Sequence, residues 1–231
     1  MGKIVHLNYG HGGKDPGGTG NGMQEKNEVL AIGKKTAKIL RDHKVDVRET
    51  RTTDVYIALK TIADKANAEG ADIFVSFHTN AQNGVANGVE VFSYPGSAKG
   101  MELSRDLLNQ LVADKLFKTN RGNKTANFAV LRYTKMPAAL LELGFIDHTE
   151  DAKVIKNNKD GIALSVAKGI LKNIGVEYMG DKKDVQAHWG EKPFKELNDG
   201  GIKIHEKRFD DPITRAEVFS IASQLLKKKM N

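Results

Sequence analysis

Short apolar segments alternate with longer amphipathic ones along most of this chain. Residues 3–8 and 71–78 are almost continuously apolar, as in buried strands, whereas residues 45–51 alternate between apolar and polar positions. Further strands are predicted over residues 89–93, 128–132 and 138–145. Most of these strands are separated by segments whose apolar residues follow a different period.

That different period is helical. Helices are predicted over residues 27–43, from about Tyr56 to Gly70, over residues 97–117 and over residues 161–173. Strands that alternate with helices indicate an α/β fold, here a twisted, mixed, mostly parallel sheet flanked by helices. In such sheets, functional groups gather beyond the strand ends.

The pattern changes after Val176. Residues 178–184 are polar and are predicted to form a linker. Two amphipathic helices are predicted beyond it, over residues 186–199 and 214–229. We therefore predict an α/β domain over residues 1–177 and a small all-α domain over residues 185–231.

Composition narrows the ligands and partners. The 231 residues include no cysteine, so a metal ion would be held by His, Asp and Glu. A formal net charge of +7 favours a polyanionic partner, but no block of Arg and Lys with interleaved aromatic residues predicts nucleic-acid binding. No apolar run reaches the length of about eighteen residues that a membrane span needs. The N-terminus lacks the pattern of a signal peptide, so we expect synthesis in the cytoplasm.

Four residues are candidates for metal binding or catalysis. His11 follows the first strand inside a glycine-rich loop, and His78 ends the strand of residues 71–78. Glu25 lies just before the first helix, and Glu142 interrupts an apolar strand, where a carboxylate is costly unless it is paired or used. Each also has a structural interpretation: a turn residue, a strand-end imidazole, a helix-start carboxylate and an ion-pair partner. The residues alone leave both interpretations open.

Five segments resemble, in order and spacing, the zinc-dependent N-acetylmuramoyl-L-alanine amidases of the amidase-3 type. They are GHGGKDPG (10–17), QEKN (24–27), TRTTD (50–54), SFHTNA (76–81) and LELGF (141–145), and the resemblance covers about residues 3–175. It implies that His11, Glu25 and His78 bind Zn²⁺ and that Glu142 is the catalytic carboxylate. The family usually has Asp-Pro where this chain has Asn8-Tyr9, so the group that orients His11 from behind is not identified.

The resemblance implies a peptidoglycan hydrolase that cuts the amide between N-acetylmuramic acid and the L-alanine of the stem peptide. Two imidazoles and one carboxylate leave an open position on zinc for water, whose proton Glu142 would take and hand to the leaving amine. The missing signal peptide favours a phage or prophage endolysin that acts on the cell wall after release. The alternatives are a host autolysin or spore-lysis amidase, a non-catalytic wall-binding protein, and a zinc carboxypeptidase or deacetylase.

Two polar residues near these segments are weaker candidates for substrate binding. Arg51, at a strand end, either holds a substrate carboxylate or, in the interpretation we favour, forms an ion pair with Asp54. Asn80 follows His78 by two residues and either orients the site or the substrate, or caps a loop.

The C-terminal segment resembles a single S-layer homology motif, through His188-Trp189 and the run Thr214-Arg215-Ala216-Glu217. The resemblance implies a wall-targeting unit in which Arg215, with Trp189 nearby, contacts an anionic secondary cell-wall polymer. The alternative is a helical appendage in which Thr214 and Glu217 only cap the helix and Trp189 only packs. The motif usually occurs in threes, so one copy would bind weakly or gain avidity by self-association. The oligomeric state stays open.

Overall fold

The computed structural model of this protein describes residues 2–180. The chain divides into two units, Met1–Tyr178 and Met179–Asn231. The helices predicted over residues 186–199 and 214–229, with Trp189 and Arg215, lie outside the described residues and stay predictions. Within residues 2–180, no helix is both long and apolar enough to cross a membrane.

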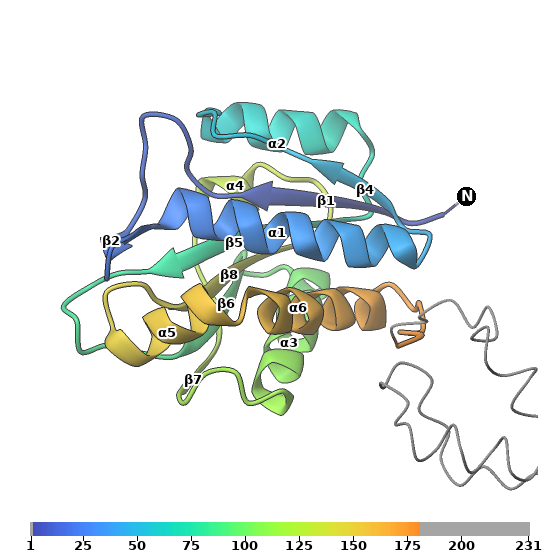
Figure 1. Ribbon diagram of the computed structural model, residues 1–231. Coiled ribbons are helices and arrows are strands. Elements are labelled where there is room, and N and C mark those ends of the chain that lie inside the picture. The colour runs from blue at the N-terminus through green and yellow to red at the C-terminus, as the bar shows by residue number, and fades with distance from the viewer. Residues whose placement is uncertain (1, 181–231) are drawn as a thin grey trace, which may run out of the picture. The chain divides into compact units, whose positions relative to one another are not determined.

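A six-stranded sheet in the order β4-β1-β5-β8-β6-β7 forms the centre of the first unit (Figure 1). The first four of these strands run parallel, β6 is antiparallel to β8, and the edge strand β7 is parallel to β6. This confirms the predicted mixed, mostly parallel sheet, and it brings the carboxyl ends of four strands to one edge. The strands are β1 (Ile4–Tyr9), β4 (Asp46–Glu49), β5 (Ile73–Asn80), β6 (Val89–Ser93), β7 (Asn120–Thr125) and β8 (Ala138–Phe145).

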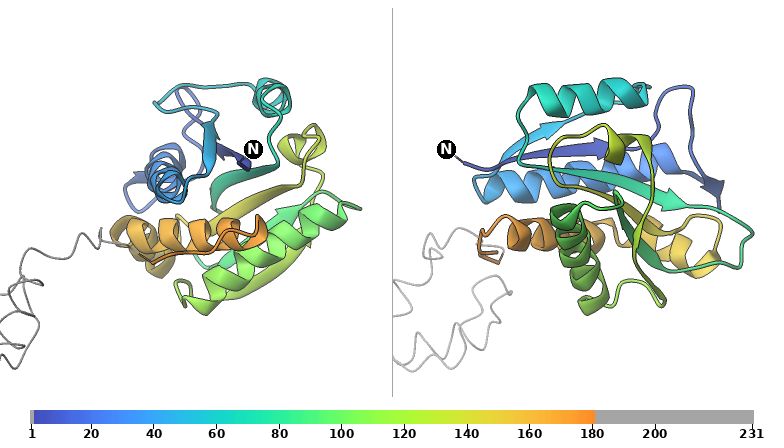
Figure 2. Two further views of the ribbon diagram at one scale, coloured as in Figure 1. Left: turned by 90° about the vertical axis from the view of Figure 1, so that its right-hand side faces the viewer. Right: turned by 180° about the vertical axis from the view of Figure 1, so that it is seen from behind.

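Helices cover both faces of the sheet (Figure 2). One face carries α1, α3, α5 and α6, and the other carries α2 and α4. A two-stranded hairpin, β2 (Thr19–Gly20) and β3 (Met23–Gln24), lies between β1 and α1. The helices are α1 (Glu25–Asp42), α2 (Leu59–Ala68), α3 (Ala98–Ala113), α4 (Ala129–Arg132), α5 (Thr149–Asn157) and α6 (Lys159–Asn173).

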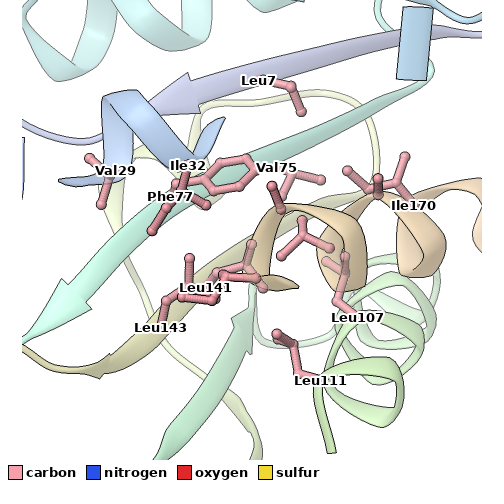
Figure 3. Packing of buried hydrophobic residues seen from close by; sticks show 14 of the residues in the cluster. Leu7, Val29, Ile32, Val75, Phe77, Leu107, Leu111, Leu141, Leu143 and Ile170 are labelled. Atoms are coloured by element: carbon pink, nitrogen blue, oxygen red, sulfur yellow. The ribbon is translucent and has the colours of Figure 1, made fainter. Parts of the chain in front are cut away.

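Alternation along the strands sends neighbouring side chains into two different cores. In β5, Val75 and Phe77 pack with α1, α3 and α6 in the larger core (Figure 3). Phe74 of β5 and Leu140 of β8 pack instead with α2 and α4 in the smaller core. Because side chains two residues apart share a face, His78 and Glu142 project from the face that α2 and α4 cover.

The structure corrects several predicted elements. The strand predicted over residues 128–132 is wrong, because Ala129–Arg132 forms α4, and its short apolar run holds too few positions to distinguish the two periods. Strand β7 was not predicted, since its sequence NRGNKT is polar and lies at the sheet edge. Helix α5 was also not predicted, and the helix predicted over residues 97–117 ends at Ala113.

Candidate metal centre

His11 lies in the loop after β1, in a backbone conformation that residues other than glycine rarely adopt. Its φ angle is 62°, and backbone hydrogen bonds of 2.9 and 3.1 Å between Gly12 and Asp15 close a tight turn beside it. The Nδ1 atom of His11 lies 2.8 Å from Oδ2 of Asp15, whose Oδ1 accepts a hydrogen bond from the Gly17 N–H at 3.1 Å. Asp15 thus supports the ring from one side and leaves Nε2 to face Glu25.

Glu25 is the first residue of α1 and is buried between the two imidazoles. Its Oε2 lies 3.1 Å from Nε2 of His11 and accepts a hydrogen bond from the Gly18 N–H at 2.7 Å. Its Oε1 lies 2.9 Å from Nδ1 of His78 and accepts from the Thr79 N–H at 3.0 Å. The start of a helix favours a carboxylate at this position, because the helix dipole is positive there.

Two glycines make room for the imidazole rings. A Cβ atom on Gly10 would lie 2.2 Å from Cε1 of His78, and one on Gly17 would lie 2.5 Å from Cδ2 of His11. The rings of His11 and His78 meet edge to face, with their centres 5.0 Å apart. The glycine-rich loop therefore serves close approach of the backbone to both rings, and not only a change of chain direction.

His11, Glu25 and His78 form a group that is able to hold a metal ion, since one ligand atom from each lies within 4.8 Å of the others. Burial alone would lower the pKa of His11, but hydrogen bonds and charges from Glu25 and Asp15 outweigh it and raise that pKa to about 9. Burial alone would raise the pKa of Glu25, but the two imidazoles lower it to about 2. The surroundings therefore stabilise positive charge between these side chains, as binding of a divalent cation requires.

Glu142 of β8 lies directly between His78 of β5 and Glu90 of β6 in the strand register. Paired residues of neighbouring strands project from the same face, so the three side chains form a row across the sheet. The Oε2 atom of Glu142 is buried and has no hydrogen-bond partner among the described residues. Burial first, and then the charges of Glu25 and Glu90, raise the pKa of Glu142 well above its usual range. A carboxyl group in this setting is suited to accept a proton.

Arg51 has only 4% of its surface exposed and lies beneath the glycine-rich loop. Asp54 pairs with Lys26, so the ion pair that we favoured between Arg51 and Asp54 is not formed. Arg51 instead joins the end of β1 to the start of α1, and so fixes His11 relative to Glu25. A contact with substrate stays a prediction. The guanidinium donates hydrogen bonds of 2.8–3.0 Å to the backbone carbonyls of Tyr9, Gly10, Lys26 and Thr53.

Asn80 combines a loop contact with a contact inside the site. Its Oδ1 accepts a hydrogen bond from the Ala81 N–H at 2.9 Å, which is the expected capping interaction. Its Nδ2 donates to Oε1 of Glu90, also at 2.9 Å. Asn80 therefore holds the carboxylate that neighbours Glu142, and a direct contact with substrate stays a prediction.

Comparison with known proteins identifies the family. Residues 5–172 match Amidase_3, the N-acetylmuramoyl-L-alanine amidase family. The chain belongs to this family. A structure of another amidase, N-acetylmuramoyl-L-alanine amidase AmiC2 of Nostoc punctiforme, matches 75% of this chain and 97% of its own, with 34% identity and a TM-score of 0.71.

Two relatives of this chain come from different biological settings. The chain is 40% identical over 182 residues to the endolysin of Bacillus phage SPP1, an alignment that covers 75% of this chain and 65% of the endolysin. It is 38% identical over 167 residues to the sporulation-specific N-acetylmuramoyl-L-alanine amidase of Bacillus subtilis strain 168. That alignment covers 71% of this chain and 64% of the amidase. The chain therefore spans slightly less than two thirds of the length of each of these relatives.

Two carboxylates of the site, Asp15 and Glu90, are not among the residues predicted from the sequence. Asp15 lies in the segment GHGGKDPG, four residues after His11, and its carboxylate supports the His11 ring. It thereby supplies the partner that could not be identified from Asn8-Tyr9. Glu90 interrupts the apolar strand VEVFS, which is the same signal that singled out Glu142 in LELGF. Glu90 could therefore have been predicted from the sequence in the same way as Glu142. The contact between Asp15 and His11 could not, because it depends on the turn of the loop.

Proposed function

We propose that this protein is a zinc-dependent peptidoglycan hydrolase that cleaves the amide between N-acetylmuramic acid and the L-alanine of the stem peptide. The observation that carries the proposal is the group of His11, Glu25 and His78 beside Glu142, whose Oε2 is buried and has no hydrogen-bond partner within residues 2–180. Membership of the Amidase_3 family supports the choice of this amide over the others in the wall.

His11, Glu25 and His78 would hold the zinc ion. Two imidazoles and one carboxylate, without a thiolate, are a donor set of catalytic zinc sites. When bound, the ion would polarise the amide carbonyl and lower the pKa of a water molecule to about 7. Asp15 would keep the ring of His11 in place by accepting a hydrogen bond from Nδ1, because carboxylates behind ligating imidazoles fix ring orientation.

Glu142 would move the proton. It takes the proton of the attacking water as the new bond forms between the water oxygen and the carbonyl carbon. It then passes that proton to the amide nitrogen as the carbon–nitrogen bond breaks. The products are the free carboxylate of the muramic acid and the free amino group of alanine. Burial of Glu142 and the nearby carboxylates of Glu25 and Glu90 favour its proton-bearing state and so assist this uptake.

Analysis of the digested peptidoglycan tests the reaction. Zinc-loaded full-length protein should release stem peptides that start with a free L-alanine, as detected by mass spectrometry, and leave the glycan acetyl groups intact. Shortened stem peptides would indicate a carboxypeptidase, and free glucosamine amines would indicate a deacetylase. Binding of peptidoglycan without any product would indicate a non-catalytic wall-binding protein.

For the biological role we propose a phage or prophage endolysin, supported by the 40% identity to the endolysin of phage SPP1. The 38% identity to a sporulation-specific amidase supports the alternative of a host enzyme. Comparing rates on vegetative walls and on spore cortex separates an endolysin from a sporulation-specific amidase, since an endolysin should degrade vegetative walls faster. Attachment of residues 185–231 to an anionic secondary cell-wall polymer, through Trp189 and Arg215, is proposed from the sequence resemblance.

A further inference from the structure

Two cations share one buried carboxylate next to the candidate catalytic residue. Glu90 is 4% exposed, and its Oε2 lies 3.2 Å from Nε of Arg121 and forms an ion pair with Nζ of Lys124. Its Oε1 accepts the hydrogen bond from Asn80. One carboxylate is neutralised by one cation, so Arg121 and Lys124 together leave one unit of positive charge at this position.

The two cations are held in place but remain open to solvent. The guanidinium carbon of Arg121 lies 4.9 Å from the centre of the Phe145 ring, and Nζ of Lys124 lies 5.9 Å from that of Phe92. The side chains of Arg121 and Lys124 are 31% and 40% exposed. They are therefore fixed on one side by Glu90 and an aromatic ring and available to an anion on the other.

The position of the pair relative to Glu142 follows from the strand order. Glu90 of β6 lies opposite Glu142 of β8, and β7, which carries Arg121 and Lys124, is the next strand outward (Figure 1). Two strand spacings amount to about 10 Å. An extended peptide advances about 3.3–3.6 Å per residue. A peptide that starts at Glu142 and runs outward across β6 would thus bring the side group of its second residue near the cations.

We propose that Arg121 and Lys124 bind a carboxylate on the second residue of the stem peptide, the residue after the alanine that the cut releases. The proposal rests on the proposed function. It assigns the enzyme a preference for stem peptides in which this carboxylate is free over those in which it is a carboxamide. Glu90 and Asn80 act as positioning residues that hold the two cations at the edge of the site.

Two soluble probes differ only in this group: N-acetylmuramoyl-L-alanyl-D-glutamate and the corresponding D-isoglutamine compound. Cleavage of either by the zinc-loaded wild-type protein tests the proposed function. Affinity for both, measured by calorimetry on the zinc-loaded Glu142→Gln protein, tests the binding site independently of turnover. We expect the free carboxylate to bind about tenfold more tightly, as charge-assisted hydrogen bonds provide.

Variants in the same background locate the preference. The double variant Arg121→Gln with Lys124→Gln should abolish the preference, because its affinity for the glutamate probe falls while its affinity for the isoglutamine probe is unchanged. Because this double variant leaves the buried carboxylate of Glu90 without a cation, a triple variant that adds Glu90→Gln removes that charge as well and should show the same loss of preference. Lys60→Gln on α2, whose partner is Asp64, lowers the net charge by one, as the triple variant does, and as a control should keep the preference. Equal affinity of the starting protein for both probes, or a preference that survives in the triple variant, would overturn the proposal.

Discussion

The Nδ1 atom of His11 lies 2.8 Å from Oδ2 of Asp15, four residues later in the same loop. The carboxylate that supports this imidazole therefore comes from after the histidine and not from the strand before it. Asn8 and Tyr9, which replace the family's Asp-Pro, are buried and bind Ser76 and Glu49 through hydrogen bonds of 2.8 and 2.9 Å. Asn8 and Tyr9 thus form hydrogen bonds within the sheet, and Asp15 of the loop supports His11.

Asp15→Asn should weaken zinc binding without unfolding the protein. The amide keeps the shape of the side chain but loses the charge that holds His11, and loss of such a supporting carboxylate typically costs about 10- to 100-fold in metal affinity. Competition with a chromogenic chelator measures the affinity. Asp64→Asn, in an exposed pair on α2, is the matched control and should bind zinc like the wild type. Unchanged affinity in Asp15→Asn would show that Asp15 does not support the ligand.

Gly10→Ala should disrupt the metal centre through contact alone. The added methyl group would lie 2.2 Å from the His78 ring, and Gly10 is not among the residues with a positive φ, so backbone strain does not contribute. We expect zinc affinity to fall more than tenfold while circular dichroism stays native. Gly2→Ala is the control, because its nearest atom would be 3.9 Å away. Normal zinc binding by Gly10→Ala would mean that the ring of His78 does not pack against this position in solution.

In the metal-free protein, His11 should make stability depend on pH. Its pKa is raised from 6.5 to about 9 in the folded state, so the folded protein holds this proton more tightly than the unfolded chain does. The contribution is complete below pH 6.5 and is lost as pH rises through 9. Because 24% of the His11 side chain is exposed, solvent screening reduces this contribution to the free energy of unfolding to about 2 kcal/mol.

Urea unfolding of the wild type and of His11→Gln, both in the presence of a chelator, isolates this contribution. The difference between the two free energies of unfolding should be largest near pH 6 and should shrink by pH 9.5. A difference that stays constant over this range would contradict the raised pKa of His11.

The sequence predicts the parts of this fold in which one period runs over many residues. The apolar strands β5 and β8 and the amphipathic helices α1 and α6 lie where their patterns placed them, and the strand ends bring His78 beside Glu142. The edge strand β7 has no such pattern, because one of its sides has no neighbouring strand and its residues are polar.

Hydrogen bonds from side chains to the backbone could not be predicted from the sequence either. Arg51 donates hydrogen bonds to four backbone carbonyls. Every residue has a backbone carbonyl, so the sequence does not identify these acceptors, and it favoured the nearby carboxylate of Asp54 instead. The support of His11 by Asp15 depends on a turn whose closure is set by φ angles within the loop. Zinc binding by His11, Glu25 and His78 and catalysis by Glu142 remain proposals for experiment.

Glu142→Gln tests the central claim most directly. The substitution keeps the size of the side chain and removes its ability to take up a proton. Zinc content, measured by atomic emission, should stay at the wild-type level, while release of stem peptides from peptidoglycan should fall by about 100-fold or more. Glu150→Gln, an exposed glutamate on α5, should retain full activity. Wall hydrolysis near the wild-type rate by Glu142→Gln with zinc bound would contradict the account.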